Sequence, residues 1–300
     1  MSTTDSPVRL APITAANVTP PKRGFLTALK QLSPMAMGGG ILVAIVVVIA
    51  IFAPLLAPYD PFEMDQAARL TGPSAAHWLG GDLYGRDVLS RILYGSRVSM
   101  TVGVIVTLSA VIIGGALGLL AGYVGGAVDA VIGRITDVFL AVPGILLAIA
   151  IVAVLGPGLT NVSIALAIGQ TPQMIRVVRS STMAIRGRPM VTAAISIGAG
   201  RSRVLFVHIM PYVLGAAVVQ GTFVFAHAIL YEASLSFLGV GITPPEPTWG
   251  NMINEARAFL SHAPTNAIFA GIAISILVLG VNLLGDGLRD VIDTEGRAKL

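Results

Sequence analysis

Long apolar segments alternate with polar ones along most of the 300-residue chain. Each apolar segment is long enough, or nearly so, to cross a bilayer, since about 20 residues span its hydrocarbon core. The pattern therefore predicts an all-α membrane protein with six transmembrane helices. We expect these helices at residues 35–57, 99–122, 139–155, 159–175, 207–238 and 267–284.

The polar segments divide the chain further. Residues 1–34 contain five prolines and no apolar periodicity, which predicts a largely disordered tail rather than a signal peptide. Gly156-Pro157-Gly158 predicts a tight turn between the third and fourth helices, and Pro172 should kink or end the fourth. The expected divisions are a tail at 1–34, a first helix at 35–57, a loop at 58–98, a core at 99–290 and a charged tail at 291–300.

The composition supports a membrane protein. Hydrophobic residues make up 55% of the chain and charged residues only 11%, whereas soluble domains are about one quarter charged. The absence of cysteine excludes disulfides, thiolate catalysis and cysteine metal sites. The net charge of +4 does not indicate nucleic-acid binding, because the placement of the basic residues has another explanation.

Lysine and arginine fall unevenly on the two sides of the predicted membrane. Of the 19 such residues, 14 lie in residues 1–34 and 289–300, at Arg134 or in the polar stretch 176–206, and 5 lie in the alternate segments. The positive-inside bias places both termini and 176–206 in the cytoplasm. The four arginines of the outer loop at 58–98 are balanced by five carboxylates.

Few polar residues interrupt the apolar segments. An ionisable group at membrane depth faces the helix bundle or a water-filled path. Glu232 and His227 are five residues apart, about 140° around a helix, so they do not share a site. Packing within the core and lining of a translocation path both remain open for Gln220, His227, Glu232 and Asn282.

Glycine recurs every fourth residue at Gly114, Gly118, Gly122 and Gly126. On a helix these glycines form one smooth stripe that a second helix can approach closely. The stripe predicts either ordinary helix packing or a surface on which two helices slide.

The sequence contains no recognisable catalytic set. It lacks a His-Glu-x-x-His metal motif, a nucleophile elbow and a glycine-rich phosphate loop followed by lysine. We therefore expect no enzyme activity, no bound cofactor or metal, and no ATP site on this chain. If ATP drives the protein, a partner must supply the ATP site.

The polar stretch 176–206 includes a short predicted helix. Pro189 suits a first helical turn, and Ala193, Ala194 and Ile197 offer a small apolar face. Gly198 and Gly200 should then break the helix. A basic cytoplasmic loop and a helix to which a partner binds both fit this pattern.

The same stretch resembles a family motif. Ala193-Ala194-x3-Gly198, followed after nine residues by His208-Ile209-Met210-Pro211, resembles the E-A-A-x3-G-x9-I-x-L-P motif of ABC-importer permeases. Thr192 stands at the glutamate position and Met210 at the leucine. The departure at Thr192 removes any expectation of a charged contact there.

Three further segments resemble dipeptide, oligopeptide and nickel permeases of this superfamily, and the likeness covers about residues 35–295. They are His77-Trp78-Leu79-Gly80 with Asp82 and Gly85–Arg91, Glu232–Gly241 with Pro244-Pro245 and Trp249–Met252, and Asn282–Asp290.

The resemblance implies the type I ABC-importer permease fold in the bacterial inner membrane, and a subunit that forms half of a pore. Its implied partners are a homologous DppB/OppB-type permease, two ATP-binding subunits that use ATP and Mg²⁺, an extracytoplasmic binding protein, a peptide substrate and membrane lipid. Residues 189–203 would be the coupling helix. The implied ATPase-coupling residues are Thr192, Ala193, Ala194, Gly198, Arg201, His208 and Pro211. The implied binding-protein contacts are Trp78, Asp82, Arg86, Asp87, Trp249 and Asn251.

Two rival functions remain open. Nickel or another small ligand could replace the peptide within the same family. An ion-coupled secondary transporter working alone is disfavoured, because the apolar segments carry a single carboxylate, Glu232. An intramembrane enzyme is weaker still for want of a catalytic set.

Overall fold

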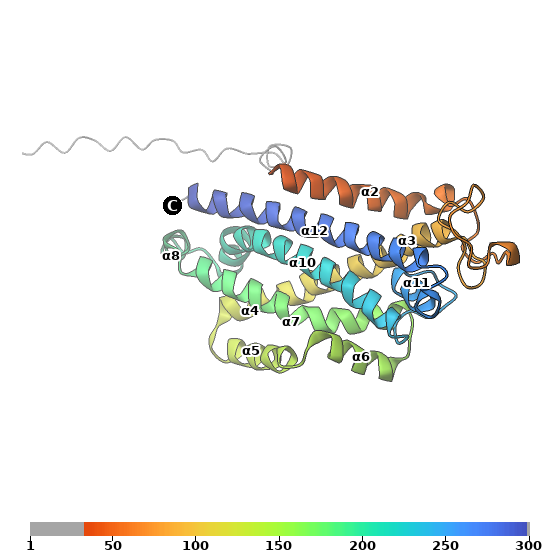
Figure 1. The fold of residues 1–300 in the computed structure, drawn as a ribbon. Coiled ribbons are helices and arrows are strands. Elements are labelled where there is room, and N and C mark those ends of the chain that lie inside the picture. Colours follow the sequence, from red (N-terminus) through yellow and green to blue (C-terminus); the bar gives the residue numbers. More distant parts are fainter. Residues whose placement is uncertain (1–32, 299–300) are drawn as a thin grey trace, which may run out of the picture. The chain divides into compact units, whose positions relative to one another are not determined.

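The computed structural model describes residues 33–298, with side chains up to Ile292. The predicted tail at 1–34 lies almost wholly outside the described residues, as does the end of the tail at 291–300. Among the described residues there is no β-strand, so the all-α prediction is confirmed there (Figure 1). The helices are α2 (Pro34–Leu56), η1 (Gln66–Ala68), α3 (Val88–Ser109), the π-helical η2 (Ala110–Gly114), α4 (Gly115–Val124), α5 (Gly126–Leu140), α6 (Gly144–Leu155), α7 (Leu159–Arg186), α8 (Pro189–Ser196), α9 (Arg201–Arg203), the π-helical η3 (Val204–Ile209), α10 (Met210–Phe237), α11 (Trp249–Ala256), η4 (Arg257–Phe259) and α12 (Thr265–Ala298).

Four of the described helical stretches are long and apolar enough to cross a membrane. A fifth is added if α5 and α6, which meet at an 87° bend, count as one broken span. α7 is not among them, since it carries polar residues such as Asn161, Gln170 and Gln173 as well as three arginines. The count of six transmembrane helices therefore stays a prediction. The four stretches are Pro34–Leu56, Val88–Val124, Arg201–Phe237 and Thr265–Ile292.

The second predicted helix begins too late. α3 starts at Val88, eleven residues before Ser99, because the Asp87 side chain accepts a hydrogen bond from the Ser90 amide at 2.7 Å and caps the helix. Its charged first turns look like loop in the sequence. The fold hides Arg91 completely among carboxylates, so the helix can carry it.

The third predicted helix, 139–155, is wrong as a single element. Pro143 follows the end of α5 and precedes α6, and a residue before proline is kept out of the helical conformation. The fourth helix does not end at Pro172 but continues to Arg186. The predicted polar stretch 176–206 thus begins as the last turns of α7.

The glycine stripe packs α4 against α7. A Cβ carbon added at Gly118 or Gly122 would lie 2.7 Å from a backbone carbonyl of α7, and one at Gly114 would lie 2.9 Å away. Gly126 has no such neighbour and starts α5. The predicted close approach of a second helix is confirmed for three of the four glycines, and ordinary packing and a sliding surface both stay predictions.

Candidate functional site

α8 is the short helix predicted in the polar stretch. Pro189 occupies its first turn, and the helix ends after Ser196. Gly198 has a φ of 84°, the left-handed conformation that glycine adopts without steric cost. The predicted coupling helix at 189–203 is therefore shorter than expected, because residues 197–200 leave the helix before α9 begins.

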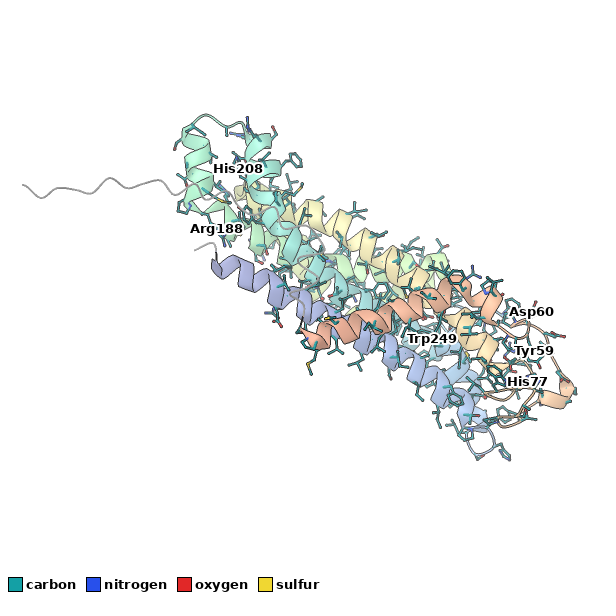
Figure 2. The ribbon with its side chains drawn as sticks, turned by 90° about the horizontal axis from the view of Figure 1, so that it is seen from above. Tyr59, Asp60, His77, Arg188, His208 and Trp249 are labelled. Atoms are coloured by element: carbon teal, nitrogen blue, oxygen red, sulfur yellow. The ribbon has the colours of Figure 1, made fainter. Side chains whose placement is uncertain are left out.

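The two alanines of the motif face opposite ways. Ala194 and Val191 are buried, and Val191 packs in the same core cluster as Val204. Ala193 and Thr192 are exposed, and the Ile197 side chain beyond them is 86% exposed. The outward side chains here are thus small (Thr192, Ala193 and Ser196) or apolar (Ile195 and Ile197). Figure 2 shows Arg188 and His208 together at this end of the bundle.

α8 returns to the bundle through η3. Ile209 is fully buried there, His208 is half-buried, and Pro211 lies in the first turn of α10. The Tyr123 hydroxyl at the end of α4 donates to the Arg201 carbonyl at 3.0 Å. The segment after α8 is therefore tied to α4 as well as to α10.

Ion pairs join α5 to the polar half of α7. Arg179 donates two hydrogen bonds to Asp129, and Arg176 donates one to Asp137 at 2.9 Å. The hydrogen bond from the Arg179 guanidinium to Asp129 raises the pKa of Arg179. α5 is thereby held to the second half of α7.

The polar residues predicted at membrane depth are scattered. Gln220 lines a cavity of about 310 Å³ together with Arg289. Glu232 is fully buried and accepts a hydrogen bond from Ser236 at 2.9 Å, whereas His227 is exposed. The two side chains lie in different surroundings, as their spacing around the helix predicts. Asn282 is half-buried on α12, and its role is untested.

The six predicted binding-protein contacts belong to the loop before α3 and to α11, and Figure 2 shows Trp249, Tyr59 and His77 away from the end that carries Arg188 and His208. Trp78 is 69% exposed. The other five have buried side chains that form bonds inside this chain. They are Asp82, Arg86, Asp87, Trp249 and Asn251.

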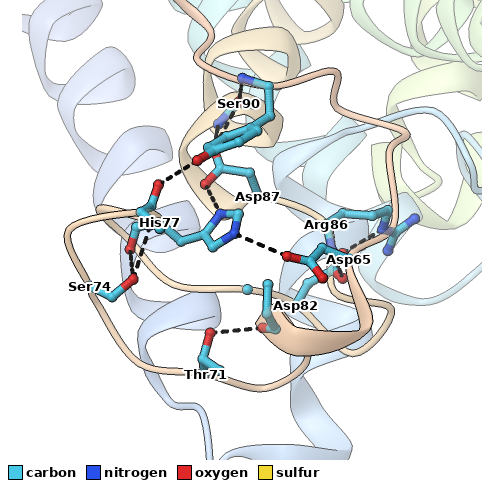
Figure 3. A network of polar contacts seen from close by, with 12 residues as sticks. Asp65, Thr71, Ser74, His77, Asp82, Arg86, Asp87 and Ser90 are labelled. Atoms are coloured by element: carbon cyan, nitrogen blue, oxygen red, sulfur yellow. Dashed lines mark hydrogen bonds and ion pairs between the residues drawn. The ribbon is translucent and has the colours of Figure 1, made fainter.

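Asp87 organises the loop through an unpredicted partner, His77. The His77 Nδ1 atom lies 3.0 Å from Asp87, and its Nε2 atom lies 3.9 Å from Asp65 (Figure 3). The Tyr59 ring lies against the His77 ring with centroids 4.7 Å apart. His77 opens one of the resemblance motifs, and this was the available signal for its role.

A second cluster joins Arg86 to α11. Arg86 donates to Asp82 at 2.6 Å and to Glu255 at 2.7 Å. Glu255 and Arg91 were not predicted to take part. Arg91 lies in ion-pair contact with the same two carboxylates. In the part of the chain that the structure describes, no three His, Asp or Glu side chains converge as metal ligands.

Two protein families match the chain. Residues 114–295 match the family described as "Binding-protein-dependent transport system inner membrane component". Residues 32–73 match the N-terminal transmembrane domain of oligopeptide transport permease C. The first match covers α4 to α12, which includes α8 and α11.

Individual relatives agree. The chain is 46% identical over 268 residues to the dipeptide transport system permease protein DppC of Alkalihalophilus pseudofirmus, an alignment covering 89% of this chain and 88% of the relative. It is 46% identical over 260 residues to the glutathione transport system permease protein GsiD of Pectobacterium atrosepticum, covering 86% of each. Identity to the Haemophilus influenzae DppC is 41% over 295 residues, covering 96% of this chain and 98% of the relative.

A solved structure shares the fold. The MetNI methionine ABC transporter, in an inward-facing conformation, gives a TM-score of 0.56 at 18% identity, over 67% of this chain and 96% of that chain. At this identity the likeness supports the fold alone. The resemblance predicted from the sequence motifs is confirmed by the family matches and relatives. The chain belongs to the family of inner-membrane components of binding-protein-dependent transport systems.

Proposed function

We propose that this chain is a permease subunit of an ATP-driven ABC importer for peptides, in which it forms half of the translocation pore. The observation that carries the proposal is 46% identity to a dipeptide permease over 89% of the chain. Glutathione is itself a small peptide, so the glutathione permease relative falls in the same substrate class.

α8 is the proposed contact with the ATP-binding subunits. Its outward side chains are small or apolar and can enter a groove, while its buried side holds it to η3. Because the sequence has no phosphate loop, ATP and Mg²⁺ would be held by those subunits. Closing of the partner subunits would bias the bundle between two arrangements.

The remaining partners follow from the same function. A homologous second permease would complete the pore, and an extracytoplasmic binding protein would deliver the peptide to the end that carries Trp78. α2, α3 with α4, the bent pair, α7, α10 and α12 would make six passes, with both termini in the cytoplasm.

The topology can be tested by thiol labelling. The chain contains no cysteine, so a single introduced cysteine reports its own position. A membrane-impermeant maleimide added to intact spheroplasts should label Trp78→Cys and spare the exposed Ser196→Cys. Labelling of both, or of Ser196→Cys alone, would contradict the proposed topology.

The substrate class is tested by uptake. A strain lacking its own peptide and glutathione importers would be complemented with this chain and its partner genes. Uptake of labelled dipeptide or glutathione, with no effect of either on nickel uptake, supports the proposal. Uptake of nickel alone would favour the nickel alternative.

The energy source of uptake distinguishes the proposed ABC importer from an ion-coupled secondary transporter. Uptake should collapse on depletion of ATP and persist when a protonophore dissipates the proton gradient. The reverse sensitivities would favour an ion-coupled transporter.

A single variant tests whether α8 binds the ATP-binding subunits. Ala193→Asp places a charge on the exposed surface of α8, whereas Ala194→Asp would bury one and risk unfolding. The Ala193→Asp chain should reach the membrane but lose uptake and co-purification of the ATP-binding subunits. Normal uptake by this variant would count against docking at α8.

A further inference from the structure

Four charged side chains from three separate segments meet at the end of the bundle opposite α8. Asp82 and Arg86 belong to the loop between α2 and α3, Arg91 lies in the first turn of α3, and Glu255 lies on α11. The first three are buried, and the Glu255 side chain is only 14% exposed. Two positive and two negative charges make the cluster neutral.

Arg86 is the bridge of the cluster. Its Nε atom donates to Asp82 at 2.6 Å and its Nη2 atom to Glu255 at 2.7 Å, although Arg86 and Glu255 are 169 residues apart in sequence. Arg91 adds attraction to the same oxygens, at 3.4 Å from Asp82 and 3.6 Å from Glu255. Hydrogen bonds between charged groups are the stronger ones, and here they join the loop to α11.

The loop is fixed internally before it meets α11. The Asp82 carboxylate also accepts from the backbone amides of Tyr84 and Arg86, at 2.8 Å and 2.9 Å (Figure 3 shows this part of the loop). The Asn266 side chain of α12 donates to the Gly81 carbonyl at 3.3 Å. A force on the loop is therefore carried to Arg86 rather than absorbed in flexible backbone.

α11 is fixed to the membrane helices in turn. The Trp249 indole donates to the Ile92 carbonyl of α3 at 3.0 Å. The backbone of Gly250 lies directly on that of Ala233 in α10, with no room for a side chain. Movement of α11 must therefore displace α10, α3 or both.

Buried charges are expensive to desolvate, and well-packed apolar residues often stabilise a protein as well or better. The charges instead fix the position of the loop relative to α11, because separating the two segments would leave a buried charge without a partner. The cluster thus links the loop directly to α11, two segments that are otherwise connected only through the helices of the bundle.

We propose that Asp82, Arg86, Arg91 and Glu255 form a latch that makes the 57–87 loop and α11 move as one body. A binding protein that docks on the loop then displaces α11 and the adjoining end of α10. The identity of this partner rests on the proposed function, whereas the latch is a property of this chain. The four residues are positioning residues, and none is assigned to substrate binding.

The latch is tested first by hydrogen exchange in the assembled transporter. Glu255→Gln keeps an acceptor oxygen but removes the charge, so it should speed amide exchange in both the 57–87 loop and residues 249–256, by about tenfold, since a charge-assisted hydrogen bond is weakened. Glu246→Gln is the matched control, since Glu246 is an exposed carboxylate on the same connection. Faster exchange in one segment alone, or in neither, would overturn the latch.

A chemical cross-link then tests whether the role of the cluster is to connect the loop to α11. Arg86→Cys with Glu255→Cys should lower the stimulation of ATP hydrolysis by the binding protein, and a short bifunctional thiol reagent should restore it. The chain has no other cysteine, and each single variant with the reagent controls for reaction elsewhere. A linked, folded complex that stays unstimulated would overturn the latch.

The two assays also separate the latch from the proposed function. A wild-type complex that no peptide-binding protein stimulates contradicts the function. The hydrogen-exchange result still decides the latch in that case.

Discussion

Gly118 of α4 lies so close to Ile175 of α7 that a Cβ carbon at position 118 would stand 2.7 Å from the Ile175 carbonyl oxygen. The same Cβ carbon would lie 2.8 Å from the Val178 side chain. Real Cβ carbons do not come this near to backbone oxygen, so the distance between the two helices depends on the missing side chain. Gly115, on the same helix, has no neighbouring atom within 4 Å of its added Cβ.

Gly118→Ala should therefore destabilise the protein by about 1–3 kcal/mol, the usual cost of overpacking a core. Thermal unfolding in detergent, followed by size-exclusion chromatography, measures the loss. Gly115→Ala is the control and should be neutral or slightly stabilising, since alanine favours a helix over glycine. Equal unfolding temperatures for the two variants would show that α4 and α7 can separate without cost.

Gly198→Leu should impair coupling while leaving the membrane level unchanged. Leucine pays about 1–2 kcal/mol in the left-handed conformation that position 198 adopts, and it has open space around it, so the strain falls on the turn after α8. Uptake should fall at least about fivefold. Gly198→Asn should lose less, because asparagine tolerates this conformation. If the two variants lose uptake equally, backbone strain is not the cause.

Ser236→Ala should lower stability by about 1–3 kcal/mol. The Ser236 hydroxyl donates to the buried Glu232 carboxylate at 2.9 Å and accepts from the Ile242 amide at 3.2 Å, so the change leaves two buried groups short of a partner. Ser234→Ala, whose hydroxyl bonds only to the carbonyl of Leu230 in its own helix at 2.7 Å, should change little. Unfolding by heat compares the two, and a larger effect at Ser234 would refute this assignment.

Trp249→Phe isolates a single hydrogen bond in α11. Phenylalanine keeps an aromatic ring against Gly95 but cannot donate to the Ile92 carbonyl, so the loss should be about 1 kcal/mol. Trp249→Ala also removes the buried ring and should cost about 3–5 kcal/mol. Denaturation in mixed micelles provides both values. A phenylalanine variant as unstable as the alanine variant would mean that ring packing contributes little.

The helices most faithful to the sequence are those with an uninterrupted apolar run. α2 lies within one residue of its predicted ends, and α10 begins and ends near the predicted limits of 207–238. Where a helix carries charged residues, hydropathy does not predict its bounds correctly. The start of α3 was missed because Arg91 is neutralised by Asp82 in the preceding loop and by Glu255 on the distant α11, a combination that hydropathy does not reveal.

The same limit applies to the candidate sites. The glycine that ends α8 could be predicted, because a left-handed turn has a residue signature in the sequence. The role of Arg86 in joining Asp82 to α11 could not, since Glu255, its second partner, becomes a neighbour only after α11 folds onto α3. Motif residues that look like surface contacts are thus buried, and Trp78 alone of the six stays largely exposed.

α7 is a long helix that connects the two ends of the bundle. Its 28 residues extend about 42 Å at 1.5 Å each, from the turn before α8 to Gly158. The Gly158 amide there donates to the Gly241 carbonyl at 3.2 Å, in the segment that leads to α11. A push along the axis of α7 at its α8 end would thus reach Gly158 through a single helix. The point of α7 expected to bend most easily is Pro172, whose missing amide hydrogen removes one backbone hydrogen bond of the helix.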